Sequence, residues 1–177
     1  MLSRITPGAS LFLAYTAPLV LQAFSTGPPI KRTGAPVDGG LNCTACHQTF
    51  APANSDPRGK LQLQTAPYTP GVKQIVRVMI EHPEATRWGF SLTARLASDE
   101  AKQAGTFTLT ADFRVQCDPR GDAPCNGALE FISHLRTATS DSTRPGTPGG
   151  SSWDVEWTPP ATDCGPRHLL RRRQRRQ

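Results

Sequence analysis

The chain has 177 residues, which is enough for one ordinary domain with appendages but too few for two domains with separate cores. Its formal net charge of +6 comes largely from arginines at 171–173 and 175–176, and without them the chain is close to neutral. A basic surface spread over the whole domain is therefore excluded, and we expect no nucleic-acid partner.

Residues 1–25 have the pattern of a secretory signal peptide. Arg4 supplies a charged start, an apolar run follows, and Ala23-Phe24-Ser25 resembles a cleavage site between small residues. The apolar run is interrupted by a threonine and a proline and is shorter than the ~20 apolar residues that a membrane span needs. Cleavage is therefore favoured over an uncleaved anchor. We expect an extracytoplasmic protein, located in the periplasm, at the cell surface or secreted.

Residues 26–59 are rich in proline and glycine and are expected to form an irregular N-terminal leader. This leader contains Cys43-Thr44-Ala45-Cys46-His47, which is the spacing of a c-type haem attachment site. In such a site both thiols form thioethers to the haem, and the adjacent histidine is an axial ligand of the iron. The sequence therefore predicts haem c bound by Cys43, Cys46 and His47.

Two other interpretations of this motif remain open. Cys43 and Cys46 can instead form a disulfide with no haem bound, whereas a zinc site would need two more ligands, and the chain has no second C-x-x-C and no H-x-x-x-H. If haem is bound, His134 and His82 are candidate sixth ligands, although a structural role suits either one better. Met79 lies in an apolar run and fits a core position better.

From Lys60 onward the chain changes to alternating and β-branched runs separated by turn residues. These runs predict strands near 61–65, 75–80, 90–96, 107–110, 113–115, 129–135 and 153–157. The one helical segment is expected at 98–104, about one turn with Ser98 as its cap. The fold class is therefore all-β, an antiparallel immunoglobulin-like β-sandwich over residues 60–166.

The remaining cysteines and the tryptophans add further expectations. Cys117 and Cys125 bracket a turn-rich segment and are a candidate disulfide, which leaves Cys164 over. The three tryptophans at 88, 153 and 157 are expected to pack in or around the sandwich, with carbohydrate stacking as the alternative. Gly89, between two aromatic residues, suggests a bend or a close approach of the backbone.

The order of these features resembles a family of bacterial secreted proteins with a reelin-type (Reeler-like) domain, in particular its choice-of-anchor subgroup. The resemblance covers roughly residues 34–165 and rests on Gly34-Ala35-Pro36, Asn42 to His47, Tyr68 to Gly71, Arg87 to Ala94, Ile132-Ser133-His134 and Trp153 to Pro160. It implies a non-enzymatic extracytoplasmic β-sandwich that follows a C-x-x-C-H leader and precedes an anchor.

No catalytic signature emerges, because the chain has no G-x-S-x-G, no phosphate-binding glycine loop and no H-E-x-x-H. We therefore expect an exported cell-surface protein whose haem serves electron transfer or redox sensing with a redox partner protein. The alternative is an adhesion or structural module of the cell envelope without haem. A small haem peroxidase is less favoured.

The basic tail at 167–177 departs from the resemblance, which leads us to expect a further strand of the type Val-Thr-Phe-Tyr. One permitted set of codons for these residues, read from the second nucleotide, encodes Val-Thr-Phe-Tyr-Ala-Ala-Gly-Asn-Ala-Ala. The tail is therefore interpreted as a product of a one-nucleotide frameshift near Pro166. A genuine basic appendage that contacts anionic surfaces is the alternative.

The nucleotide sequence of the gene tests the frameshift directly. We expect a run of cytosines near the codon for Pro166, and removal of one nucleotide there should open a frame that encodes the missing strand. A shifted frame that does not encode Val-Thr-Phe-Tyr would contradict this interpretation.

Overall fold

The protein is described by a computed structural model, which covers residues 27–47, 55–119, 121–135, 144–145 and 149–162. The predicted signal peptide, Cys164 and the basic tail at 167–177 lie outside these residues. Within them, no helix is both long and apolar enough to cross a membrane.

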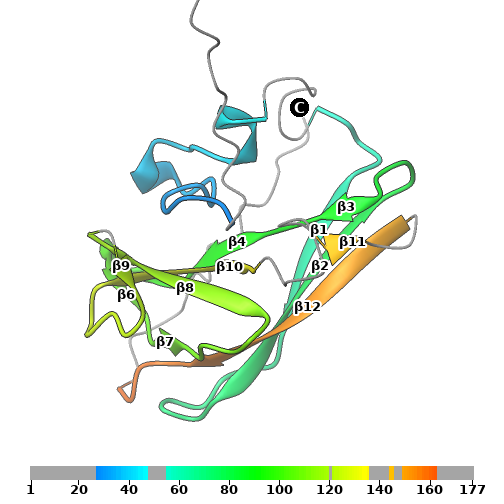
Figure 1. Cartoon of the computed structure of the whole chain (residues 1–177). Coiled ribbons are helices and arrows are strands. Elements are labelled where there is room, and N and C mark those ends of the chain that lie inside the picture. The colour runs from blue at the N-terminus through cyan, green and yellow to red at the C-terminus, as the bar shows by residue number, and fades with distance from the viewer. Residues whose placement is uncertain (1–26, 48–54, 120, 136–143, 146–148, 163–177) are drawn as a thin grey trace, which may run out of the picture.

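The described residues form an all-β structure in which two four-stranded sheets pack face to face (Figure 1). The first sheet has the order β1 (Lys60–Thr65), β2 (Gln74–His82), β12 (Gly149–Thr158), β7 (Thr106–Phe107). The second has the order β4 (Ser91–Thr93), β10 (Leu129–His134), β8 (Phe113–Asp118), β9 (Gly121–Asp122). Two short ribbons pair β3 (Arg87–Trp88) with β11 (Arg144–Pro145) and β5 (Arg95–Leu96) with β6 (Asp99–Gln103). Every pairing is antiparallel, as the sequence predicts.

The core forms because apolar residues alternate along the long central strands, so that one face of each sheet is apolar. In β12, Trp153, Val155 and Trp157 point inward, with exposed or half-exposed polar residues between them. Val78 of β2 pairs with Trp153 on one side and with Leu63 of β1 on the other. The three strands therefore contribute to one continuous apolar face.

All three tryptophans are buried, with exposed fractions of 3% for Trp88, 4% for Trp153 and 2% for Trp157. The Trp157 indole also donates a hydrogen bond of 2.8 Å to the Ala104 carbonyl. Rings buried in this way have no free face for a sugar, so the packing role predicted for them is confirmed and the carbohydrate-stacking alternative is wrong.

The helix expected at residues 98–104 is wrong, because Asp99–Gln103 forms strand β6 in a hairpin with β5. Its residues are good helix formers, but so short a helix is marginal without tertiary support. Here the backbone pairs with β5 instead, and the Arg95 guanidinium donates to the Glu100 carbonyl at 2.6 Å. Pairing within the hairpin therefore overrides the local preference.

The leader is not a free arm. Residues 27–47, blue to cyan in Figure 1, lie on the side of the β4–β10–β8 sheet that faces away from the first sheet. This outer face carries Phe131, which alternates with core residue Ile132 and is only 1% exposed. The leader thus forms a partial third layer that covers the second sheet.

The close backbone approach predicted at Gly89 is present in the structure. A Cβ atom at this position would overlap the His134 ring, whose Nδ1 accepts a hydrogen bond of 2.9 Å from the Phe90 amide. Only glycine allows the ring of His134 to sit against the backbone here.

Gly89→Ala should therefore lower the free energy of unfolding by about 1–3 kcal/mol, the usual cost of forcing atoms into a packed site. Gly121→Ala is the matched control, because a Cβ there meets nothing within 4 Å and the expected change is under about 0.5 kcal/mol. Urea unfolding of both variants checks this. Equal losses would contradict the close approach.

Candidate functional site

The C-x-x-C-H motif folds into one tight turn. Residues Cys43–Ala45 form a short 3-10 helix whose N-cap is Asn42, and the Asn42 side chain accepts hydrogen bonds from Thr44 N (2.9 Å) and Thr44 Oγ1 (2.7 Å). The Cys43 carbonyl in turn accepts from the amides of Cys46 (3.2 Å) and His47 (3.0 Å). The turn therefore gathers both thiols and the imidazole within five residues.

The two cysteines of this turn are free thiols on exposed residues, and His47 is also exposed. Cys43 is exposed as a residue, but desolvation of its sulfur raises the pKa of the thiol. The neighbouring Cys46 adds a smaller increase to this pKa. Since the thiolate is the reactive form, Cys43 is a poor nucleophile at neutral pH without an activating partner.

The candidate sixth ligands are held by other contacts. His82 uses both ring nitrogens, because Nε2 lies 3.1 Å from Asp56 Oδ2 and Nδ1 accepts from the Glu84 amide at 3.2 Å. His134 is bound through Nδ1 to Phe90, and burial lowers its pKa. Met79 is half-buried in β2.

Across the described part of the chain, no group of three or more His, Cys, Asp or Glu side chains is placed to hold a metal ion. The turn therefore keeps Cys43, Cys46 and His47 close along the chain without placing their side chains as a ligand set, and no described contact joins a second ligand to them.

His82 belongs to an exposed polar network that joins the chain before β1 to the chain after β2. Arg58 contacts the carboxylates of Asp56 (2.7 Å) and Glu84 (2.6 Å), and its hydrogen bonds to Asp56 lower the pKa of that carboxyl well below its usual range. The sequence did not predict this network, because its two halves, Asp56 with Arg58 and His82 with Glu84, are 26 residues apart along the chain.

A buried ion pair holds the leader on the sandwich. Arg95 Nη2 lies 2.5 Å from Asp38 Oδ2, and the two side chains are 1% and 5% exposed. The Arg95 guanidinium also lies 5.5 Å from the centroid of the Phe131 ring, within the range of a cation–π contact. No sequence signal predicts this pair, because Asp38 stands in a glycine-rich loop and Arg95 reads as the polar residue of an alternating strand.

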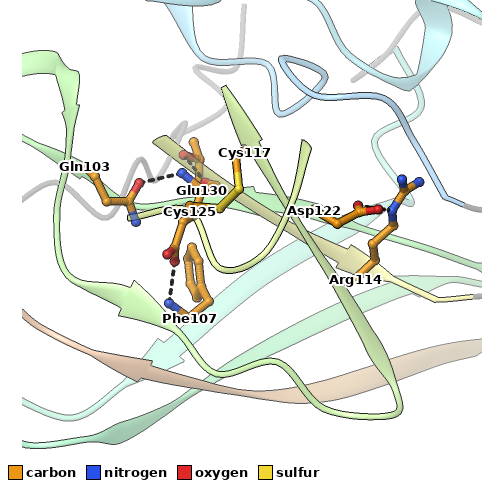
Figure 2. Close-up of a disulfide and its surroundings, with 8 residues drawn as sticks. Gln103, Phe107, Arg114, Cys117, Asp122, Cys125 and Glu130 are labelled. Atoms are coloured by element: carbon orange, nitrogen blue, oxygen red, sulfur yellow. Dashed lines mark hydrogen bonds and ion pairs between the residues drawn. A yellow bond between two sulfur atoms is a disulfide. The ribbon is translucent and has the colours of Figure 1, made fainter. Parts of the chain in front are cut away.

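The disulfide predicted between Cys117 and Cys125 is confirmed, and it closes the connection between β8 and β10 (Figure 2). Glu130 is opposite Cys117 in the β8–β10 ladder and is 6% exposed. Its carboxylate accepts from the Phe107 amide at 2.7 Å, and its own amide donates to Gln103 Oε1 at 2.8 Å. Glu130 therefore ties β10 to β6 and β7.

The sequence matches no model of a known protein family and no curated protein. Among solved structures, the chain is similar to the crystal structure of the human F-spondin reeler domain (fragment 2), at 20% sequence identity and a TM-score of 0.33. The match covers 58% of this chain and 67% of that chain. The fold class given above rests on the two sheets themselves.

Burial raises the pKa of Glu130, partly opposed by its hydrogen bond from Phe107, which makes the stability of the protein depend on pH. The folded state keeps this proton to a higher pH than the unfolded state does. The free energy of unfolding should therefore fall as pH rises from the ordinary pKa of a glutamate through the raised folded value. Glu130→Gln removes this loss and keeps an acceptor oxygen for Phe107.

Urea unfolding between pH 4 and pH 8 should show Glu130→Gln gaining stability relative to the parent protein as pH rises. Glu84→Gln is the control of opposite sign. Arg58 lowers the pKa of Glu84, so the parent protein should gain stability relative to Glu84→Gln as pH rises. A constant difference between Glu130→Gln and the parent would show that Glu130 is not desolvated.

Proposed function

We propose that this chain is an exported, non-catalytic β-sandwich module with a structural or adhesive role at the cell surface or envelope. The observation that carries this proposal is the Cys117–Cys125 disulfide inside the sandwich. Structural disulfides form and persist in oxidising compartments, which agrees with the signal-peptide pattern of residues 1–25. Both features support an extracytoplasmic location.

The outer face of the first sheet suits such a module. Cross-strand ion pairs line it, between Arg77 and Asp154 (2.6 Å), Lys73 and Glu156 (2.7 Å), and Lys60 and Glu81 (3.7 Å). Exposed pairs of this kind add little stability, but they place charged, hydrated groups along this face. The face is suited to exposure to water, while the aromatic core supplies the rigidity.

Covalent haem at the leader is the second candidate, and the free, exposed thiols of the Cys43 turn favour it. Cys43 and Cys46 would hold the porphyrin through thioethers, and His47 would be the axial ligand. When bound, haem supplies one-electron redox chemistry at its iron. Asn42 fixes the turn that presents the three groups, and the exposed apolar side chain of Leu41 precedes it directly.

Cys43, Cys46 and His47 thus have the chemistry that covalent attachment of haem needs. A sixth iron ligand from the sandwich would require His82 or His134 to give up its present hydrogen bonds. If haem were attached, His47 would be the residue of this turn that could bind its iron, and the haem would supply one-electron redox chemistry. Redox sensing or electron transfer with an external partner is then favoured over a buried relay.

One experiment separates the two candidates. The full chain, with its own leader, is produced in a bacterium that carries the cytochrome c maturation system, and the exported protein is analysed by intact mass under non-reducing conditions and by absorption. Cys43→Ala/Cys46→Ala is the matched control, because it removes both attachment sites and leaves the sandwich disulfide in place.

The structural module predicts an exported chain that begins near Thr26, carries the Cys117–Cys125 disulfide and has no haem mass or Soret band. Attached haem predicts both the added mass and the band, each lost in the control variant. Retention of the chain in the cytoplasm with reduced cysteines would contradict the proposed location and role.

A further inference from the structure

Residues 27–40, called the strap below, cross the outer face of the second sheet (Figure 1). Three points along the strap lie close to the sheet. A Cβ atom added at Gly27 would lie 3.2 Å from the Ser133 hydroxyl and 3.0 Å from the His134 carbonyl, Lys31 contacts Asp118 at 2.7 Å, and Asp38 contacts Arg95 at 2.5 Å. The strap is thereby attached to β10, β8 and β5 in turn.

These contacts differ in how far they are shielded from water. The side chains of Lys31 and Asp118 are 43% and 23% exposed, so solvent and salt screen their attraction. Those of Asp38 and Arg95 are almost fully buried. Removal of either partner there leaves a polar or charged group without compensation inside the interface, which is costly. The Asp38–Arg95 ion pair is therefore the main contact that holds the strap on the sheet.

The rest of the interface is poorly suited to a permanent contact. Of the six buried polar side-chain atoms that lack a hydrogen-bond partner among the described residues, four belong to the strap or to the residues beneath it: Arg32 Nε, Thr33 Oγ1, Arg95 Nε and Ser133 Oγ. Among the described residues of this region, Ala35 and Phe131 are buried outside the main core, and Pro28, Pro29 and Ile30 are half-buried. Buried polar atoms without a hydrogen-bond partner weaken the contact.

The sandwich core does not depend on the strap. None of the strap residues belongs to the apolar cluster between the two sheets, which includes Val76, Val115, Ile132 and Trp153. Departure of the strap would uncover Phe131 and the Arg95 guanidinium, and it would leave the packing between the sheets intact.

We propose that the strap is a releasable segment, pinned by Asp38 and Arg95, which leaves the outer face of the second sheet without unfolding of the sandwich. In the docked state it holds the Cys43 turn beside the sandwich. In the released state the turn is free, and an arginine next to an aromatic ring is opened to solvent. Release of the strap is a local opening that costs less free energy than global unfolding of the protein.

Limited proteolysis of the full chain tests this inference, because trypsin can cleave after Lys31 and Arg32 only when the strap is accessible. Cleavage at these bonds is followed by mass in the parent protein, Asp38→Asn and Arg95→Met, while amide exchange of β2 and β12 reports on the sandwich. Asp154→Asn is the matched control, since it removes the partner of Arg77 on the far sheet.

We expect cleavage in the strap to accelerate roughly tenfold or more in Asp38→Asn and Arg95→Met, because the cleavage rate follows the open population. Asp154→Asn should stay within about twofold of the parent, and exchange in β2 and β12 should not change in any variant. Unchanged cleavage would show that the ion pair does not hold the strap.

Faster cleavage in the strap together with an equal loss of protection from amide exchange in β2 and β12 would show that the strap and the sandwich unfold as one unit. That result would overturn the inference. If Asp38→Asn does not fold, Arg95→Met decides, because the carboxylate that it leaves without a partner lies on the strap and enters water when the strap is released. Failure of both variants to fold would also overturn it.

Discussion

The guanidinium of Arg95 is buried on the outer face of the second sheet, where it meets the Asp38 carboxylate, the Glu100 carbonyl and the Phe131 ring. A charge in such a place is tolerated only when it is paired and hydrogen-bonded. The Glu100 carbonyl comes from the β5–β6 hairpin and the carboxylate from the leader. The arrangement of the hairpin, the second sheet and the leader thus depends on one side chain.

This dependence changes how the C-x-x-C-H motif is understood. A motif in an irregular, proline-rich segment looks like a tethered appendage, yet the turn at Cys43 follows directly on a segment that is anchored at Asp38. While the strap is docked, the turn with its two thiols is held beside the sandwich. At the same end of the second sheet, the disulfide closes the chain that follows β8, and Glu130 fixes β10 to the short strands beside it.

The sheets were predictable from sequence because alternation of apolar residues reports directly on which face of a strand is buried. Trp153, Val155 and Trp157 show this most clearly, and the Cys117–Cys125 pair followed from its turn-rich spacing. Strand β6 was missed because local preference for helix was outweighed by pairing within a hairpin. Asp38 and Arg95 were missed because contacts between residues 57 positions apart leave no periodic pattern.

Docking of the leader on the second sheet joins the motif to the sandwich, and proton–proton contacts in solution test this docking. In an NMR spectrum of the isotopically labelled full chain, we expect nuclear Overhauser contacts between the Hα protons of Gly27 and the Hβ protons of Ser133, together with contacts from Asp38 to Arg95. Random-coil chemical shifts for residues 27–40, without contacts to β10 or β5, would contradict it.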